Sequence, residues 1–247
     1  DAKKYGGALL IRDYGVVTNC TFTDNKADRG GAIFGGNYIE QWSVNGWGTK
    51  GDDIGLTITG CTFEGNDAVT SGGAFNLDMS CYTTIDDCTF TGNTAGVSGS
   101  AMWLWENCTM TNLTVTGNVC ANNGYALVLA DSEFDGQTYI NGLFKMGGNM
   151  IVKDNEGGDV FMDYKTTIGT FLDNGYGPKT EMHITLDEGY LTQRVDGTYN
   201  YEGGDLQYII TAGNRSITDP EFDPNAASKT QQQKAESSDI LLYAGIG

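Results

Sequence analysis

Hydrophobic and polar positions along this chain follow two short phrases that alternate between about residues 5 and 160. In the first phrase a glycine pair is followed by alanine and an apolar residue, in full at residues 6–9, 30–33 and 72–75. Weaker copies of it lie at residues 99–102, 124–127 and 157–160. The starts of these six copies are 24, 42, 27, 25 and 33 residues apart, spacings that are typical of the coils of a solenoid.

The second phrase places an aromatic or β-branched residue three positions before an asparagine. Its five copies are Phe22 with Asn25, Phe63 with Asn66, Phe90 with Asn93, Val115 with Asn118, and Val152 with Asn155. In both phrases apolar side chains recur at every second position, as in Met102 and Leu104 or in Cys20 and Phe22. This period of two predicts strands that bury one face, with residues such as Thr21 on the outer face.

One such unit cannot bury its apolar face alone, but stacked units can, because equivalent strands then pair in parallel at about 4.8 Å. The glycine pairs are expected to form tight bends where a Cβ would clash, and the asparagine amides to hydrogen-bond from coil to coil. Parallel crossover connections are right-handed in almost every case. We therefore predict an all-β fold, a right-handed single-stranded parallel β-helix (solenoid) with irregular C-terminal strands.

Three segments are expected along the chain. Residues 1–163 form the coils, with an insertion at about residues 35–55, and residues 164–224 form final irregular coils or a cap. Residues 225–247 are a polar linker and a terminal apolar strand, which contains Ile240, Leu241, Leu242, Tyr243 and Ile246. The first coil starts near residue 5 and leaves an open end, for which three explanations are expected: the chain is an excerpt from a longer protein, it is a processed product, or another copy stacks on that end. The terminal strand either lies on its own coils or adds to the open end of another copy, and it is therefore the candidate for end-to-end self-association.

Alternating phrases of this kind resemble those of the polymorphic outer-membrane proteins and related bacterial adhesin-like β-helix proteins. The resemblance covers about residues 5–160 and is carried by residues 22–25, 30–33, 63–66, 72–75 and 90–93. It implies a parallel β-helix in a secreted or surface-displayed protein that is often adhesive. We accordingly expect an extracellular or cell-surface location.

Composition narrows the range of partners. The 247 residues include 32 acidic and 14 basic side chains, a formal net charge of −18. This charge argues against nucleic-acid binding, because phosphate recognition needs clustered lysine and arginine. No apolar run approaches the ~20 residues that cross a bilayer, so no membrane span is expected.

Six cysteines raise the question of disulfides. Four of them occupy inward or alanine-equivalent positions and are predicted to be small core residues: Cys20, Cys61, Cys88 and Cys120. Cys81 and Cys108 each follow the alanine position of their coil by seven residues, so they are expected to be neighbours and are candidates for a disulfide bridge. The only histidine is His183 and no Cys-x-x-Cys pair occurs, so no metal site is expected.

An enzyme is the alternative from another class, because β-helices also carry polysaccharide lyases and glycoside hydrolases. Cleavage of a glycosidic bond needs two converging carboxylates, and the candidates are Asp52 with Asp53 and Asp86 with Asp87. Neighbouring residues of a strand point to opposite faces, so neither pair is expected to converge unless it lies in a bend. The chain has only four arginines and no polygalacturonase-like motif, so we expect no catalytic residues.

No cofactor is expected, with calcium as the one alternative. Oxygen ligands gather in two stretches, made of Asp154, Asn155, Glu156 and Asp159, and less densely of Asp24, Asn25 and Asp28. Neither stretch matches the EF-hand loop or the calcium-binding nonapeptide repeat. We interpret them as ordinary turn residues.

The most distinctive chemistry is a set of aromatic residues outside the predicted core: Phe34, Tyr38, Trp42, Trp47, Trp103 and Trp105. Three of them lie in the insertion, a kind of segment that solenoids often use for binding. The others occupy outward positions of stacked strands, and an outward apolar row needs a cover or a partner. Two interpretations stay open. Either the insertion folds back over this row, or the aromatic residues form a platform for carbohydrate or for a host or cell-surface protein.

The leading hypothesis is a non-catalytic extracellular β-solenoid that acts as a surface or adhesive structural module. The alternatives are a self-assembling subunit of an extracellular filament and a polysaccharide lyase or glycoside hydrolase. Glycan binding by the tryptophans, assembly through the terminal strand, and oligosaccharide cleavage by the aspartates are the properties that separate these three hypotheses.

Overall fold

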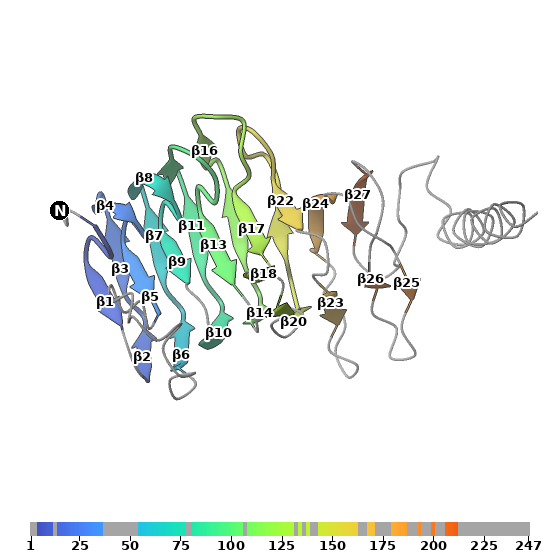
Figure 1. The fold of residues 1–247 in the computed structure, drawn as a ribbon, viewed down its shortest axis with the longest axis horizontal. Coiled ribbons are helices and arrows are strands. Elements are labelled where there is room, and N and C mark those ends of the chain that lie inside the picture. Colours follow the sequence, from blue (N-terminus) through green and yellow to red (C-terminus); the bar gives the residue numbers. More distant parts are fainter. Residues whose placement is uncertain are drawn as a thin grey trace, which may run out of the picture.

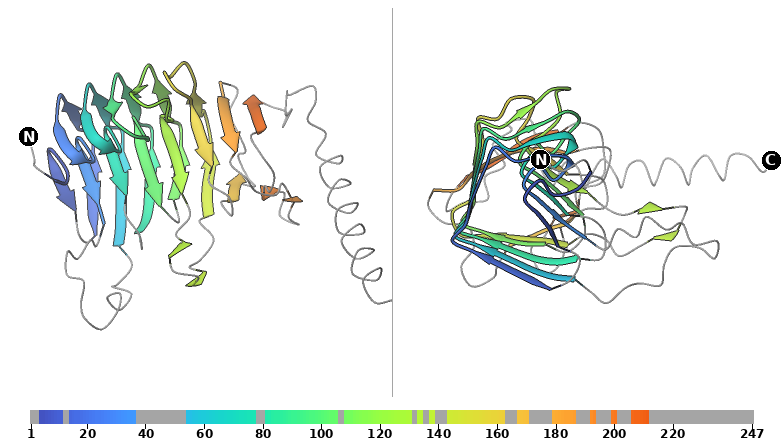
Figure 2. Two further views of the ribbon diagram at one scale, coloured as in Figure 1. Left: turned by 45° about the horizontal axis from the view of Figure 1, so that its top comes forward. Right: turned by 90° about the vertical axis from the view of Figure 1, so that its left-hand side faces the viewer.

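The computed structural model describes residues 4–11, 14–36, 54–77, 81–105, 108–130, 133–134, 137–138, 143–162, 167–170, 179–186, 192–193, 199–200 and 206–211. The regular elements in these ranges are strands, and they wind repeatedly round one axis (Figure 1). Viewed along that axis, successive coils superpose around a common interior (Figure 2). This arrangement confirms the predicted all-β parallel solenoid.

The described strands stack in four rows, which we call faces 1 to 4 in chain order. Face 1 contains β1 (Leu9–Ile11), β5 (Ile33–Gly35), β9 (Phe75–Leu77), β13 (Met102–Trp105), β17 (Leu127–Ala130) and β22 (Val160–Met162). Face 2 contains β2 (Gly15–Thr18), β6 (Ile54–Thr59), β10 (Cys81–Asp86), β14 (Cys108–Thr111), β20 (Leu143–Gly147) and β23 (Thr167–Thr170). Each strand of face 1 begins a new coil, so that β13 begins the fourth coil and β22 the sixth.

The two remaining faces are built from shorter strands. Face 3 contains β3 (Thr21–Thr23), β7 (Thr62–Glu64), β11 (Thr89–Thr91), β15 (Thr114–Thr116) and β21 (Ile151–Val152). Face 4 contains β4 (Lys26–Arg29), β8 (Asp67–Ser71), β12 (Thr94–Ala95) and β16 (Val119–Cys120). Equivalent strands pair in parallel, so the side chains of one coil lie over their counterparts in the next.

The period-two pattern predicts only faces 1 and 3, although face 2 carries a similar signal. Val17, Ile58 and Ile85 are buried on face 2, each three positions before an inward cysteine that immediately precedes a strand of face 3. A residue with left-handed backbone, such as Gly60 with φ +62°, stands between the two strands. This residue turns the chain and shifts the alternation of inward and outward side chains by one position. A search for one uninterrupted period of two therefore does not find the strand of face 2.

The interior is filled by rows of equal or similar side chains, one from each coil. Phe22, Phe63 and Phe90 stack with ring centroids 5.0 and 4.6 Å apart and interplanar angles of 9° and 2°. Val115 and Val152 continue the row through register pairs of face 3. A buried side chain of this size stabilises the fold by about 2–3 kcal/mol, so these rows supply most of the driving force for coiling.

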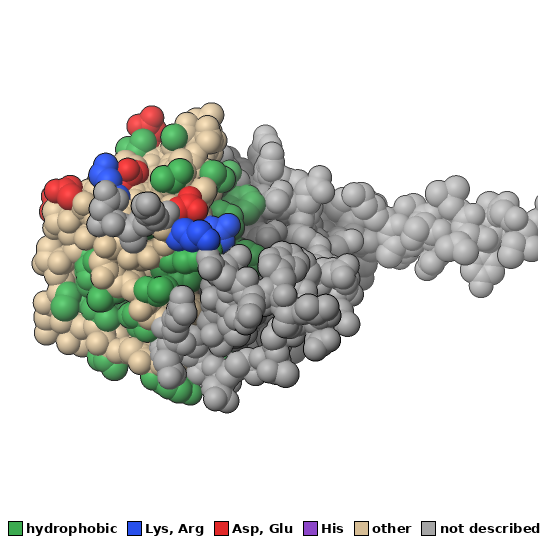
Figure 3. Space-filling view, turned by 60° about the vertical axis from the view of Figure 1, so that its left-hand side comes forward, with side chains coloured by type: hydrophobic (Ala, Val, Ile, Leu, Met, Phe, Trp, Pro, Cys, Tyr) green, Lys and Arg blue, Asp and Glu red, His purple; other side chains and the backbone are tan. Residues whose placement is uncertain are grey.

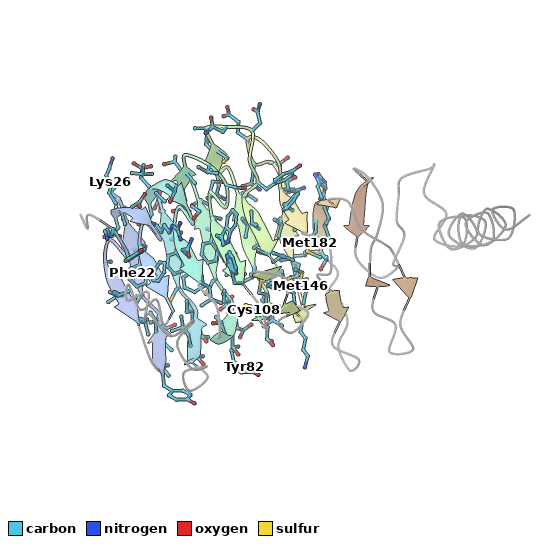
Figure 4. All side chains as sticks on the ribbon, in the orientation of Figure 1. Phe22, Lys26, Tyr82, Cys108, Met146 and Met182 are labelled. Atoms are coloured by element: carbon cyan, nitrogen blue, oxygen red, sulfur yellow. The ribbon has the colours of Figure 1, made fainter. Side chains whose placement is uncertain are left out.

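The first coil is the least covered part of the interior. Its inward Leu9 is exposed, whereas the equivalent Ile33 of the second coil is fully buried. Hydrophobic side chains accordingly reach the surface around this end of the stack (Figure 3). Figure 4 shows the contrast between the two kinds of position, with Phe22 inside the coil and Tyr82 at its outer surface.

A column of asparagines closes the corner between faces 3 and 4. The backbone N–H and the Nδ2 of each asparagine donate to the Oδ1 of the next at 2.8–3.0 Å, in the order Asn25, Asn66, Asn93, Asn118, Asn155. The three central members are fully buried. Their amides are satisfied by this column and by carbonyl groups of the preceding coil, such as the Phe63 oxygen that accepts from Asn93 at 3.1 Å. The predicted coil-to-coil amide bonds are confirmed.

The two glycines of each pair are required for different reasons. The first has left-handed backbone, as Gly30 with φ +62°, a conformation that costs an L-residue roughly 1–2 kcal/mol. The second, such as Gly31, lies outside that region. A methyl group at Gly31 would stand 2.0 Å from the carbonyl oxygen of Gly73 in the next coil. Close stacking, rather than the backbone angle, therefore demands the second glycine.

Parallel stacking ends at β24 (Glu181–Leu186), which pairs with β21 and then with β22 because it passes from face 3 to face 1 directly. β27 (Leu206–Thr211) lies antiparallel to β24. β26 (Tyr199–Asn200) lies antiparallel to β23 and to β25 (Thr192–Gln193). These are the irregular C-terminal strands expected from the sequence. The terminal apolar strand with Ile240, Leu241, Leu242, Tyr243 and Ile246 lies outside the described residues.

Replacing Asn93 by alanine is expected to lower the free energy of unfolding by about 2–4 kcal/mol, because buried amide groups of the neighbouring asparagines lose their partners. Thr91→Ala, on the outer surface two residues earlier, is the matched control and should stay within about 0.5 kcal/mol of the wild type. Urea unfolding followed by circular dichroism measures both variants. Equal unfolding free energies for the two would contradict the role of the column.

Gly31→Ala is expected to destabilise the fold by about 3 kcal/mol or more, because the next coil leaves no room for a methyl group. Gly117→Ala is the informative comparison. Gly117 has φ +65° but open space around its Cα, so alanine should cost only the backbone strain of about 1–2 kcal/mol. Thermal unfolding ranks the two variants, and a larger loss for Gly117→Ala would show that backbone angle outweighs stacking.

Candidate functional site

Two tryptophans lie on the outer surface of face 1, on the same strand. Along β13 the side chains alternate, so that Met102 and Leu104 are fully buried while Trp103 and Trp105 are half-buried and point outward. Alternate residues of a strand are about 6.5–7 Å apart, so the two indoles form one apolar strip along β13. The predicted outward placement of both tryptophans is confirmed, and we call this pair the tryptophan strip.

The neighbours of the tryptophan strip in adjacent coils are smaller and more deeply buried. Trp103 is paired with Asn76 of β9 on one side and with Val128 of β17 on the other. Trp105 is paired with Ala130 of β17. All three neighbours are buried. The two largest side chains in this part of the row are therefore also its most accessible ones.

The tryptophan strip ends at the corner between faces 1 and 2, from which the longest insertions leave. Between β5 and β6 the chain adds residues 36–53, and between β17 and β20 it adds residues 131–142. From the second insertion an antiparallel pair, β18 (Glu133–Phe134) and β19 (Gln137–Thr138), projects away from the coils (Figure 2). Trp105 is the last residue of β13, so it belongs to this corner, in a coil between those that carry the insertions.

The other residues predicted for an aromatic platform fall into two groups. Tyr38, Trp42 and Trp47 lie outside the described residues, so their part in a platform stays a prediction. Phe34 is described, is only 1% exposed, and has the ring of Tyr5 at a centroid distance of 4.6 Å. A ring covered in this way offers no face to a ligand. The prediction that Phe34 belongs to the platform is therefore wrong.

Three of the four cysteines predicted for the core, Cys61, Cys88 and Cys120, are buried, and Cys20 of the first coil is only partly buried against it. Burial raises the pKa of the Cys61 thiol and raises that of Cys88 to about 12, so both stay protonated and weakly nucleophilic at neutral pH. The predicted stacking of Cys81 on Cys108 is wrong, because the register pairs Cys108 with Thr83. This two-residue offset puts the two Cα atoms about 8 Å apart, beyond the usual disulfide range. The Cys81 side chain itself lies outside the described residues.

Asp86 and Asp87 are the candidate catalytic pair that the structure describes. Asp87 has a φ of +50° and lies in the bend between faces 2 and 3, the setting in which adjacent carboxylates could converge. The carboxylate of Asp86, however, accepts hydrogen bonds from Thr111 Oγ1 at 2.6 Å and from Asn112 Nδ2 at 3.0 Å. Both donors belong to the next coil. Asp86 therefore connects two coils. This structural role explains why a carboxylate stands here without assigning it a catalytic role.

The remaining acidic candidates are one pair outside the described residues and one stretch that the structure describes. Asp52 and Asp53 lie outside the described residues. In the stretch considered for calcium, the N–H and Nδ2 of Asn155 donate to Asp159 Oδ1 at 2.9 and 2.7 Å. That bond commits one of the expected oxygen ligands to an amide. Within the described ranges, no three acidic, histidine or cysteine side chains are placed to hold a metal ion together.

A cluster of four ionisable side chains, which the sequence analysis did not predict, lies where β21, β22 and β24 meet. Lys153 Nζ donates to Glu181 Oε2 at 2.6 Å, and Glu181 Oε1 lies 3.3 Å from His183 Nε2. His183 Nδ1 lies 2.9 Å from Asp159 Oδ2. The hydrogen bond between Lys153 and Glu181 lowers the pKa of the carboxyl group and raises that of the ammonium group. Only the pairing of β24 with both other strands brings these residues together.

Comparison with known proteins shows to which family the chain belongs. The family model described as the right-handed beta helix region matches residues 6–165. No curated protein and no solved structure matches at a significant level. Among the described residues, no helix has the length and hydropathy needed to cross a membrane. The family match covers well over half of the chain and coincides with the parallel coils, so the chain belongs to the right-handed β-helix family.

Proposed function

We propose that this protein is a non-catalytic adhesive module, located outside the cell or on its surface, that binds carbohydrate through the tryptophan strip. The observation that carries the proposal is the pair of half-buried indoles at alternate outward positions of one strand. Indole rings pack well against the apolar C–H faces of sugar rings, and two indoles in line suit an extended glycan chain. β17 pairs with all four residues of β13, and β9 pairs with Met102 and Trp103, so the backbone of the strip is ordered before a ligand arrives.

Charge narrows the class of glycan. The formal net charge of −18 opposes the approach of anionic polysaccharides, because like charges repel. The strip itself offers apolar rings and carries no charged side chain. A neutral glycan is therefore the ligand class that we propose, and a protein surface of a host or neighbouring cell is the second kind of partner.

A polysaccharide lyase or glycoside hydrolase is the alternative from another class, since right-handed β-helix regions occur in adhesin-like proteins and in such enzymes alike. Two of the described carboxylates, Asp67 and Asp86, make structural hydrogen bonds, which supports the adhesive proposal. Asp67 and Asp86 accept hydrogen bonds from Thr94 and Thr111 of a neighbouring coil, each at 2.6 Å. A catalytic carboxylate must instead direct an oxygen at the scissile bond.

The second structural alternative is a subunit of an extracellular filament. It rests on the exposed inward Leu9 of the first coil and on the terminal apolar strand at residues 240–246, which lies outside the described residues. The resemblance to polymorphic outer-membrane and adhesin-like proteins supports a surface location for either structural role. Electron microscopy of the chain with and without residues 240–247 separates the filament from the adhesive module.

The double variant Trp103→Ala/Trp105→Ala tests the tryptophan strip. We expect its affinity for the best neutral glycan of an array to fall about 30-fold or more, because truncating a central aromatic residue costs about 2 kcal/mol or more. Each single variant should fall between the wild type and the double variant. Isothermal titration calorimetry with that glycan measures the change.

Tyr82→Ala is the matched control, because it removes a ring that is 48% exposed on face 2 rather than face 1. It should bind the glycan like the wild type. A double tryptophan variant that retains wild-type affinity would remove the strip from the binding site. Shortening of the glycan by the wild type, lost in Asp86→Ala, would instead establish the enzyme alternative.

A further inference from the structure

The bend between faces 2 and 3 carries the tripeptide Asn-x-Thr in two coils. The tripeptide lies at residues 19–21 in the first coil and at residues 112–114 in the fourth. Asparagine followed two positions later by serine or threonine, with no proline between them, is the acceptor sequence for N-linked glycosylation of exported proteins. Two further copies begin at Asn107 and Asn214, which lie outside the described residues.

The bend explains the backbone conformation of these asparagines but not their amide groups. Asn19 and Asn112 have left-handed backbone, with φ +50° and +53°. The equivalent positions of the second, third and fifth coils are Gly60, Asp87 and Gly148, which are left-handed as well. Glycine, aspartate and asparagine all tolerate this conformation. Three coils therefore turn here without an amide, so the turn does not require one.

The two amides have different surroundings. Asn112 Nδ2 donates to Asp86 Oδ1 at 3.0 Å, and Asn112 Oδ1 accepts from the backbone N–H of Asn149 at 3.1 Å. Asn19 is exposed, and within the described ranges its side chain makes no hydrogen bond. Its Oδ1 lies beside Gly60 of the second coil, where a Cβ would stand only 2.5 Å away. The missing side chain at Gly60 thus leaves room for the Asn19 amide.

The other two residues of the first tripeptide also suit an acceptor. Cys20 points inward and is partly buried against the core, whereas Thr21 is an exposed outward residue of β3. The amide and the hydroxyl that define the acceptor sequence both lie at the outer surface. The middle residue, whose identity the acceptor sequence leaves open except for proline, belongs to the interior.

We propose that Asn19 is an acceptor for an N-linked glycan, a modification that rests on the extracellular or surface location proposed above. In the transfer, Asn19 Nδ2 forms a bond to C1 of the first sugar of a lipid-linked oligosaccharide. The bond between that carbon and the phosphate oxygen of the lipid carrier breaks. The lipid phosphate leaves with the electron pair of this bond, and the amide loses one proton.

A glycan at this position is compatible with binding on face 1. The bend borders faces 2 and 3, so the glycan leaves the tryptophan strip uncovered. It would instead stand beside the outer surface of face 2 in the first coil, where Tyr14 and Val16 are exposed. A bulky hydrophilic group beside these apolar side chains raises the solubility of this end of the stack.

Secretion of the full chain from yeast, behind a leader that is removed on export, tests the acceptor with the lipid-linked oligosaccharide of yeast as the donor. Trypsin releases residues 13–26 as one peptide, which contains Asn19 and no second acceptor sequence. Most of this peptide should carry a glycan. Enzymatic removal of the glycan in ¹⁸O-labelled water should convert Asn19 to labelled aspartate. An unmodified peptide from the secreted protein would overturn the proposal.

Matched variants separate the acceptor from other sources of added mass. Asn19→Asp and Thr21→Val should each lose the glycan from this peptide completely, whereas Thr21→Ser should keep it. Thr23→Val, two residues further along β3, is the control and should be modified like the wild type. Asn19→Asp is expected to fold, because Asp87 takes the same left-handed position in the third coil. A glycan that persists in Thr21→Val would show that the tripeptide is not the acceptor.

Thermal unfolding shows whether the folded coil accommodates the glycan. The secreted wild type and Asn19→Asp should unfold within about 2 °C of each other, because a glycan in solvent changes few contacts of the fold. A wild type that unfolds far below the unmodified variant would show that the bend has no room for a glycan, and the site would be excluded.

Glycan binding is measured separately, so the two proposals can fail independently. A modified Asn19 in a chain that binds no neutral glycan would remove the proposed function and leave the acceptor in place. An unmodified Asn19 in a secreted chain whose binding depends on Trp103 and Trp105 would remove the acceptor alone. Residues 13–26 of protein taken from the surface or medium of the cells that make it should carry a glycan as well, and the bare peptide there would overturn the proposal.

Discussion

In-register stacking at about 4.8 Å is the constraint on which the rest of this structure depends. It places each side chain beside its counterpart in the next coil, so every inward or corner position must tolerate a near copy of itself. Phe63 and Phe90 meet this condition by stacking their rings almost in parallel. Asn93 meets it because an amide carries both a donor and an acceptor. Gly31 meets it because it has no Cβ to strike the backbone of the next coil.

These solutions differ in how much variation they allow. An apolar row has no direction, and Val115 can follow Phe90 because dispersion and burial require only a suitable volume. The asparagine column does have a direction, since every amide donates the same way along the stack. A directed column needs a different partner at its end, which is why a carboxylate, Asp159, appears at a position that is apolar in the preceding coil. The other oxygen of Asp159 lies 2.9 Å from His183 Nδ1, so this carboxylate belongs both to the end of the column and to the ionic cluster.

Outward side chains need not match their counterparts in the next coil. The residues that we propose for binding are therefore found at outward positions. The alternation of β13 determines that Trp103 and Trp105 point away from the core, and the sequence was sufficient to predict this. How far an outward ring is covered depends on neighbours that no local pattern specifies. Phe34 has the same parity as Trp103, but the ring of Tyr5 lies against it. The predicted aromatic row therefore contains both accessible and packed residues.

The sequence by itself determined the repeat, the strands of faces 1 and 3, the inward rows and the asparagine column, because each follows from residue type at a fixed spacing. Only the tertiary structure decided the number of faces, the register of Cys108 with Thr83 and the meeting of Lys153, Glu181, His183 and Asp159. These features depend on how many residues each corner takes. A left-handed residue at a bend, or a strand that passes a corner in one step, changes which side chains face each other. The local alternation of polar and apolar residues does not predict that change.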